Sequence, residues 1–129
     1  MIFDTDVAIW LLRGEPSALS FARATPPDRR LISVVSELEL LEGCRNRREQ
    51  HAVEELLNGW FGEIVPVDAG VSRMAVRLMQ QFGLSHSPGM ADVLIAATAL
   101  ETGEPLATSN RKHFRFIPVL EIQPFSAKS

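Results

Sequence analysis

The chain has 129 residues, of which 46% are hydrophobic, and a formal net charge of −3 at pH 7. This length and apolar content predict a single domain over residues 1–129 with a core of its own. The single cysteine, Cys44, excludes an intramolecular disulfide. The most apolar stretch, residues 90–100, is too short to span a bilayer and contains Asp92, and no signal-peptide pattern opens the chain. We therefore expect a soluble, cytoplasmic protein with no membrane partner.

Short apolar, β-branched runs alternate along the chain with segments of helical periodicity. Strands are predicted at residues 1–3, 31–35, 64–67, 105–108 and 119–122. Helices are predicted at residues 6–13, 17–25, 37–48, 49–60, 71–82 and 91–102. This alternation predicts an α/β fold made of βαβ units, with a mostly parallel sheet covered by helices.

The last predicted helix, at residues 91–102, has apolar residues on almost every side. A helix of that kind is typical of a central, buried position. Ser87 followed by Pro88 predicts an N-cap and a first helical position, and Gly103 is placed to end the helix.

Two acidic residues follow the first predicted strand. Asp4 comes directly after the apolar run at residues 1–3, and Asp6 lies two positions further on. Ligands of open α/β sheets bind just outside the carboxyl ends of the strands, so Asp4 is a candidate site residue. Asp6 fits best as the N-cap of the first helix, with a secondary role near the site.

Two further acids are predicted near the same edge of the sheet. Glu39 follows the second strand, and it also fits a capping box in which Ser36 is the N-cap and Glu39 the third position. Asp92 lies in the apolar last helix, where a carboxylate needs an ion pair, hydrogen bonds or a metal. Free amide groups near the start of that helix would also stabilise it. Both the structural and the functional roles therefore stay open.

Three carboxylates at one sheet edge repel one another, and their pKa values rise unless a cation lies among them. Hard oxygen ligands select Mg²⁺ or Mn²⁺ over Zn²⁺, and no Cys/His cluster with zinc-ligand spacing exists in the sequence. A divalent metal held this way activates water and neutralises charge on a phosphoryl group. The acids therefore indicate a metal-dependent phosphodiesterase.

Four segments carry a recurring pattern when they are taken in order. They are Ile-Phe-Asp-Thr-Asp at residues 2–6, a strand and an acid-bearing helix at residues 32–43, Ala-Asp-Val-Leu-Ile-Ala-Ala-Thr-Ala at residues 91–99, and Leu-Ala-Thr-Ser-Asn-Arg-Lys-His-Phe at residues 106–114. Together they resemble the PIN-domain family, and in particular its VapC-type toxin ribonucleases. The likeness runs from end to end, and the third segment is the most specific.

The resemblance implies a three-layer α/β/α sandwich. It implies a Mg²⁺- or Mn²⁺-dependent endoribonuclease that is the toxin of a type II, VapBC-like toxin–antitoxin system. Its partners would be an RNA substrate, a small cognate antitoxin and a second copy in a homodimer. Asp4, Glu39 and Asp92 would be the catalytic, metal-binding acids.

The last of the four segments departs from the family pattern. Asn110 stands where the family often has a fourth acid, although its side-chain carbonyl could still bind a metal or a water. His113 stands at a nearby position that is often acidic. The neutral Asn110 should weaken metal affinity and argues against a second metal. The pattern also predicts that Thr108 hydrogen-bonds to Asp4 or to a ligand water.

A chain with net charge −3 needs local basic residues to hold an RNA backbone. The candidates are Arg45, Arg47, Arg48, Arg111 and Lys112. Solvated helix ends would explain the same clusters without any function.

Large apolar residues near the N-terminal helices are the sequence motive for an antitoxin groove. They are Trp10, Leu11, Leu12, Leu56, Leu57, Trp60 and Phe61. An ordinary core is the competing explanation for all seven.

Two other functions stay open at this point. An apolar run followed by Asp-x-Asp also opens haloacid-dehalogenase-type phosphatases, in which Asp4 would be the nucleophile, but the lysine and paired acids that should follow Thr108 are absent. The neutral Asn110 motivates the second alternative, a catalytically weakened PIN-like module that acts by binding a partner.

Overall fold

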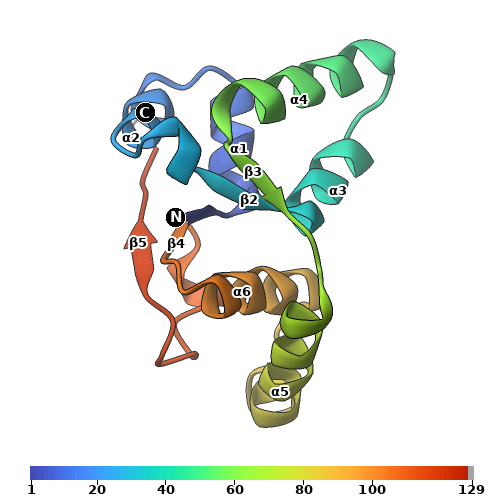
Figure 1. Ribbon diagram of the computed structural model, residues 1–129, viewed down its shortest axis with the longest axis vertical. Coiled ribbons are helices and arrows are strands. Elements are labelled where there is room, and N and C mark those ends of the chain that lie inside the picture. Colours follow the sequence, from blue (N-terminus) through green and yellow to red (C-terminus); the bar gives the residue numbers. More distant parts are fainter. Residues whose placement is uncertain (128–129) are drawn as a thin grey trace.

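A computed structural model describes residues 1–127 of the chain. Figure 1 shows its helices on both sides of a central sheet. The strands are β1 (Ile2–Phe3), β2 (Leu31–Ser33), β3 (Glu63–Val65), β4 (Leu106–Thr108) and β5 (Ile122–Pro124). The helices are α1 (Thr5–Leu12), α2 (Pro16–Arg23), α3 (Val34–Glu42), α4 (Arg47–Trp60), α5 (Ala69–His86) and α6 (Met90–Thr102), with short 3₁₀ helices η1 (Pro27–Arg29) and η2 (Arg111–His113).

All the strand pairs of the sheet are parallel, and the strand order is β3-β2-β1-β4-β5. The short strand β1 lies at the centre, where Ile2 is in register with Leu31 of β2 and with Leu106 of β4. The carboxyl ends of these three strands therefore meet at one edge. The predicted α/β fold with a parallel sheet is confirmed.

Alternate residues of β1 enter two separate cores. Ile2 packs into the cluster that α5 and α6 contribute to, which includes Val71 and Ile95. Phe3 packs on the opposite face with Val7 and other residues of α1 to α4. In Figure 1, α1 to α4 lie on one side of the sheet and α5 and α6 on the other. A strand buried on both faces is apolar throughout, which is why residues 1–3 show no alternation.

The predicted caps of the first two helices that follow strands are wrong. Asp4, not Asp6, is the N-cap of α1, and its Oδ1 accepts a hydrogen bond from the Thr5 amide at 2.8 Å. Ser33, not Ser36, is the N-cap of α3, which begins three residues earlier than the predicted N1 position. Each strand passes straight into its helix without a loop. The capping box with Glu39 therefore does not form.

The junction between α5 and α6 also differs from the prediction. Helix α5 continues to His86, and Ser87 ends it in a left-handed conformation with φ 45°. Gly89, not Ser87, is the N-cap of α6. The predicted end of α6 is confirmed, because Gly103 is its C-cap with φ 70°.

Three other boundaries moved. Helix α3 ends at Glu42, so the predicted helix at residues 37–48 extends too far. Strand β5 lies at Ile122–Pro124 and shares only its first residue with the predicted strand at 119–122. Strand β3 ends at Val65, directly before Pro66. Over residues 1–127, none of the helices is long and apolar enough to cross a bilayer.

Candidate functional site

Asp4 is the most deeply buried acid at the carboxyl edge of the sheet, with only 5% of its surface exposed. It follows β1 directly, and both of its carboxylate oxygens have donors. Oδ1 accepts from the Thr5 amide, and Oδ2 accepts from the Thr108 hydroxyl at 2.8 Å. The hydrogen bond expected from the sequence between Thr108 and Asp4 is thus present.

Asn110 supports this arrangement through its backbone. Its amide donates to Thr108 Oγ1 at 2.9 Å, which leaves the Thr108 hydroxyl proton directed to Asp4. The Asn110 side chain itself is exposed. Asn110 is therefore adjacent to the acids, and the structure gives its main chain a positioning role.

Asp6 lies in the first turn of α1 and connects this helix to the segment after β4. Its Oδ2 accepts hydrogen bonds from the Ser109 amide at 3.0 Å and from the Ser109 hydroxyl. Its Oδ1 is buried, and within residues 1–127 it has no hydrogen-bond partner. Such an atom is rare in folded proteins and points to a missing donor, water or ion.

Glu39 lies on α3 and faces α1. The Thr5 hydroxyl donates to Glu39 Oε1 at 2.5 Å and lies 2.8 Å from the Ser36 hydroxyl. Thr5, which also donates its amide to Asp4, thus connects Asp4 to Glu39, which lies 34 positions further along the sequence than Thr5.

Asp92 lies in the first turn of α6, where the helix dipole favours an acid. Its Oδ2 is 3.2 Å from Nδ1 of His113 on η2. The sequence marked His113 only as a position that is often acidic in the family, and the structure places it against a candidate metal ligand.

The pKa shifts show that the acids influence one another. Burial, followed by repulsion from Asp6, raises the pKa of Asp4 to about 7; the bonds from Thr108 and Thr5 oppose this rise, and Asp92 adds to it. Burial also raises the pKa of Asp92, against the attraction of His113 and together with repulsion from Glu39 and Asp6. The carboxylates therefore form one electrostatic cluster, which we call the acid cluster: Asp4, Asp6, Glu39 and Asp92.

The donor chemistry of the acid cluster fits a hard divalent cation. The atoms that it offers to a metal are carboxylate oxygens. Burial and mutual repulsion raise the pKa values of Asp4 and Asp92. Within residues 1–127, Asp6 Oδ1 is buried without a hydrogen-bond partner. A bound cation relieves such repulsion. Across residues 1–127, however, no three His, Cys, Asp or Glu side chains are already gathered as a set of ligands.

One predicted basic cluster lies directly beside these acids. Arg111 and Lys112 line a hollow of about 640 Å³ together with Ser109, Asn110 and His113. We call it the basic hollow. It connects to the acid cluster twice, because Ser109 binds Asp6 and His113 binds Asp92.

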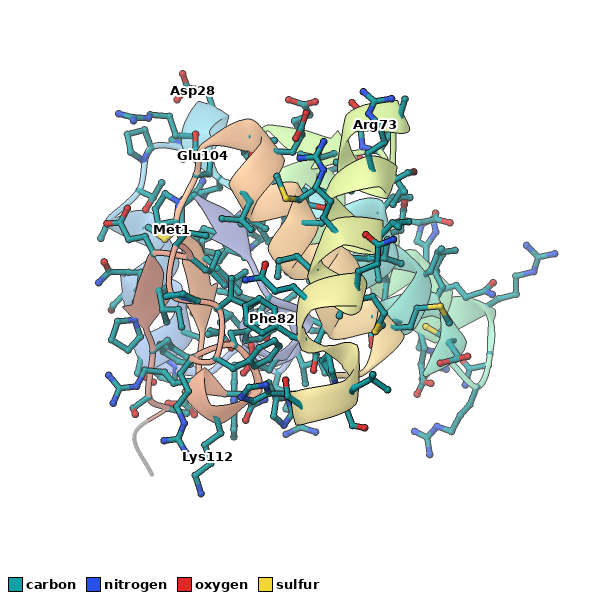
Figure 2. The ribbon with its side chains drawn as sticks, turned by 90° about the horizontal axis from the view of Figure 1, so that it is seen from below. Met1, Asp28, Arg73, Phe82, Glu104 and Lys112 are labelled. Atoms are coloured by element: carbon teal, nitrogen blue, oxygen red, sulfur yellow. The ribbon has the colours of Figure 1, made fainter. Side chains whose placement is uncertain are left out.

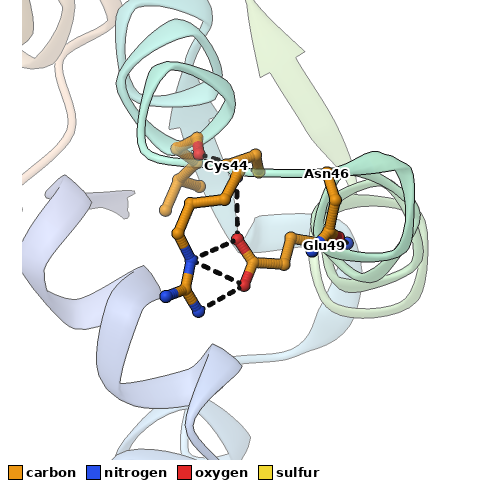
Figure 3. Close-up of polar contacts among 5 residues, drawn as sticks. Cys44, Asn46 and Glu49 are labelled. Carbon is orange, nitrogen blue, oxygen red and sulfur yellow. Dashed lines mark hydrogen bonds and ion pairs between the residues drawn. The ribbon is translucent and has the colours of Figure 1, made fainter.

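The other basic cluster lies between α3 and α4. Arg45 pairs with Glu49 at 2.8 Å and donates to it from Nε and from its main chain (Figure 3). These contacts with Arg45 lower the pKa of Glu49. Arg47 and Arg48 are exposed at the start of α4. Arg45 is therefore partly neutralised, although it lines the same hollow of about 610 Å³ as Glu39.

The apolar residues considered for a partner groove divide between core and surface. Leu11, Leu56, Leu57 and Phe61 are buried in the core shared by α1 to α4. Leu12 is 39% exposed and lines the hollow of about 610 Å³ between α1, α3 and α4. The two tryptophans are half-buried, and each has an arginine over its ring.

Sequence reasoning missed two residues of the site, Thr5 and Ser109. Thr5 binds Glu39, and Ser109 binds Asp6. Their signal was their position: each is a hydroxyl residue next to a predicted site residue at the end of a strand.

Comparison with known proteins gives one family. The family model described as "PIN domain" matches residues 1–118. "Ribonuclease VapC10" of Mycobacterium tuberculosis is 36% identical over 128 residues, which cover 98% of this chain and 93% of that protein. "Ribonuclease VapC19" of the same organism is 34% identical over 124 residues, covering 93% and 96%.

Solved structures repeat the fold. A toxin–antitoxin complex from Klebsiella pneumoniae contains a chain with TM-score 0.79 and 26% identity, covering 97% of this chain and 98% of that one. VapBC2 from Rickettsia felis, bound to a DNA fragment from its promoter, contains a chain with TM-score 0.83 and 21% identity, covering 98% and 100%. The second likeness shows the three-layer fold alone.

Proposed function

The chain belongs to the PIN-domain family and to its VapC ribonucleases, and from this premise we propose that it is a divalent-metal-dependent endoribonuclease, the toxin of a VapBC-like toxin–antitoxin pair. The family resemblance stated from the sequence is thereby confirmed. The acid cluster supports the metal dependence, because the buried Asp4 and the half-buried Asp92 lie near further acids at the carboxyl edge of the sheet, and a bound cation would relieve their repulsion. We also propose that it acts in the cytoplasm, where it would meet its RNA substrate.

Oxygens of Asp4, Glu39 and Asp92 would hold Mg²⁺ or Mn²⁺, which supplies an activated water and neutralises charge on the phosphate. The chain's own residues keep these oxygens in place. Thr108 and the Thr5 amide fix the two oxygens of Asp4, and Thr5 also fixes Glu39.

Two further groups prepare the site for a polyanion. His113 orients Asp92 through their 3.2 Å contact. The cations Arg111 and Lys112 in the basic hollow are placed to bind the RNA backbone next to the acids. Removing them would lower the salt dependence of RNA binding.

The phosphatase alternative has lost its support. The family model covers residues 1–118 as a PIN domain. In a phosphatase Asp6 would be the acid/base, but here its Oδ2 is held by Ser109. The partner-binding module without catalysis is the remaining alternative, and metal-dependent cleavage distinguishes the two.

The decisive experiment compares RNA cleavage by the wild type, by Asp4→Asn and by Asp28→Asn, each with Mg²⁺, with Mn²⁺ and with a chelator. Asp28 is an exposed residue of η1, and its side chain projects at the opposite end of the molecule from Lys112 (Figure 2). It provides the same chemical change away from the acids. We expect cleavage by the wild type and Asp28→Asn only with metal.

Asp4→Asn should reduce the cleavage rate at least about 100-fold, because even residues that only hydrogen-bond to metal ligands contribute about 10- to 100-fold. Equal cleavage by Asp4→Asn and the wild type would refute the assignment of Asp4. Absence of metal-dependent cleavage on every RNA tested would favour the binding module.

We further propose that a small antitoxin binds and inhibits this chain, and that the toxin forms a homodimer. The similar Klebsiella pneumoniae structure is a toxin–antitoxin complex. The hollow between α1, α3 and α4, with Leu12, Ile9 and Leu40 in its lining, is an apolar surface beside Glu39. Co-purification with the product of a neighbouring gene, and the mass of the free toxin in solution, test the two partners separately.

A further inference from the structure

A third hollow, of about 570 Å³, adjoins the acid cluster on the side of α5. We call it the aromatic hollow. The start of α6 contributes Asp92 to it, the α5–α6 junction contributes His86, and the segment after η2 contributes Phe116. A candidate metal ligand and a pair of rings therefore face the same space, whose volume is in the range of small-ligand sites.

The rings in this hollow form a platform. The imidazole of His86 stacks on Phe116, with 4.9 Å between ring centroids and 19° between ring planes. Phe82 meets both rings edge-on, at 5.9 Å from His86 and 5.2 Å from Phe116. Phe82 belongs to α5, and its side chain faces the C-terminal part of the chain (Figure 2).

The ring of His86 is not part of the hydrophobic core. Phe82 and Phe116 pack against the core beneath α5 and α6, whereas His86 is exposed at the last position of α5. The Ser85 hydroxyl lies 2.7 Å from His86 Nδ1 and helps to hold the ring. An exposed, positioned ring stacked on an aromatic is the arrangement on which proteins stack unpaired bases.

Cations connect this platform to the basic hollow. Lys112, His113 and Arg115 line both hollows. Within residues 1–127, neither Lys112 nor Arg115 has an ion-pair partner, and Lys112 projects into solvent (Figure 2). A backbone that follows these cations would pass from the acid cluster to the rings.

We propose that the aromatic hollow is a base-binding subsite, in which one unpaired base of the RNA substrate stacks on the His86–Phe116 pair while Lys112 and Arg115 hold the adjoining phosphates. This inference rests on the proposed ribonuclease function and adds to it a requirement for a single-stranded segment beside the cleaved bond. Stacking accepts every base, since each has a π-face. The subsite therefore selects an unpaired base and does not by itself select its identity.

The test measures binding of a short, fluorescein-labelled oligouridine to the metal-free protein by fluorescence anisotropy. The variants are His86→Ala, which removes the ring, and His86→Phe, which keeps an aromatic face. His51→Ala is the matched control, because His51 is an exposed histidine on α4, away from the hollow. We expect His86→Ala to weaken binding about 5- to 100-fold, and the other two variants to bind like the wild type.

A second probe separates stacking from charge. We would use a set of oligouridines in which the single abasic site stands at a different position in each. The abasic site should weaken binding to the wild type at one of these positions, and the same oligouridine should show no such loss with His86→Ala. In cleavage assays with metal, His86→Ala should raise KM and leave kcat nearly unchanged. Thermal unfolding should be the same as for the wild type, since His86 is exposed.

Two outcomes overturn the subsite while the ribonuclease stands. One is cleavage and binding by His86→Ala equal to those of the wild type, without any position-dependent abasic effect. The other is an equal loss of binding in His51→Ala, which would indicate nonspecific charge. A wild type that neither binds nor cleaves RNA overturns the proposed function and, with it, the subsite.

Discussion

Thr108 is fully buried at the end of β4, and its hydroxyl has two partners. It donates to Asp4 Oδ2 at 2.8 Å and accepts from the Asn110 amide at 2.9 Å. A buried hydroxyl with one donor and one acceptor is fixed in orientation. Thr108 therefore sets the direction of Asp4 from a fully buried position.

We predict that Thr108→Val lowers the rate of metal-dependent RNA cleavage about 10- to 100-fold, as loss of a hydrogen-bond partner of a metal ligand does. The valine keeps the shape and removes the donor. Thr108→Ser should restore most of the activity. Thr98→Val is the matched control: Thr98 is equally buried, but it donates to Leu94 within its own helix. Wild-type activity in Thr108→Val would refute the positioning role.

The acids themselves could be found from sequence, but their polar partners could not. Asp4, Glu39 and Asp92 stand out because each is an acid beside an apolar strand or helix. Thr5 contacts Glu39 across 34 positions, and Ser109 contacts Asp6 across 103. Such pairs depend on the sheet order, which no local pattern contains. The contact between His113 and Asp92 depends on the fold in the same way.

At the scale of elements, the sequence predicted the kind and order of helices and strands better than their ends. Strand β1 has two residues, and its next residue, Asp4, both pairs with Ala107 through its amide and caps α1. Ser33 ends β2 and caps α3. One residue serving two elements removes the loop that separate patterns imply. The predicted caps therefore lay too late in the sequence, at Asp6 and Ser36 in place of Asp4 and Ser33.

Arg30 connects the start of β2 with α2 and α4. It is only 6% exposed and precedes β2. Its Nε donates to the Trp60 carbonyl at 2.6 Å, and its Nη1 donates to Ala22 and Thr25 carbonyls at 3.2 and 3.3 Å. Its guanidinium also lies 5.1 Å from the Trp60 ring centroid. The planar guanidinium group of Arg30 thus joins the C-terminal ends of α2 and α4.

We predict that Arg30→Lys destabilises the protein by about 2–4 kcal/mol, because a single ammonium cannot reach all three carbonyls. The melting temperature should fall by roughly 10 °C for a domain of this size. Arg29→Lys is the control, since Arg29 is exposed and, within residues 1–127, forms its hydrogen bonds through its main chain. Equal melting temperatures for Arg30→Lys and the wild type would contradict this role, and RNA cleavage at low temperature should be retained.

At the scale of the whole molecule, a chain of net charge −3 keeps four acids together at one edge of its sheet. Burial, together with repulsion between these acids, raises the pKa values of Asp4 and Asp92, and this makes the stability of the protein depend on pH. Folded Asp4 holds its proton up to about pH 7, whereas the unfolded chain releases it near 3.8. The unfolded state therefore binds fewer protons between these values, so the free energy of unfolding of the metal-free protein falls as pH rises through this range.

We predict this fall as at most about 4 kcal/mol between pH 4 and pH 7, with no further contribution from Asp4 above pH 7. Denaturant unfolding in a chelator measures it. Asp4→Asn should flatten the dependence, and Asp28→Asn should keep it. Asp92 shifts in the same direction and leaves a residual slope in Asp4→Asn. Rising stability over this range in the chelator would contradict the buried, proton-holding Asp4.

A divalent metal should reverse this trend, because it competes with the proton for Asp4. At pH 8 the carboxylate is already ionised, and Mn²⁺ at about 100 times its Kd should add about 2.7 kcal/mol to the free energy of unfolding. Near pH 5.5 the same concentration should add much less, since binding must first displace a proton. Asp4→Asn should lose the metal-dependent rise in melting temperature at both pH values. A rise in Asp4→Asn equal to that of the wild type would place the metal away from the acid cluster, and a rise larger at pH 5.5 than at pH 8 would exclude competition between metal and proton at this carboxylate.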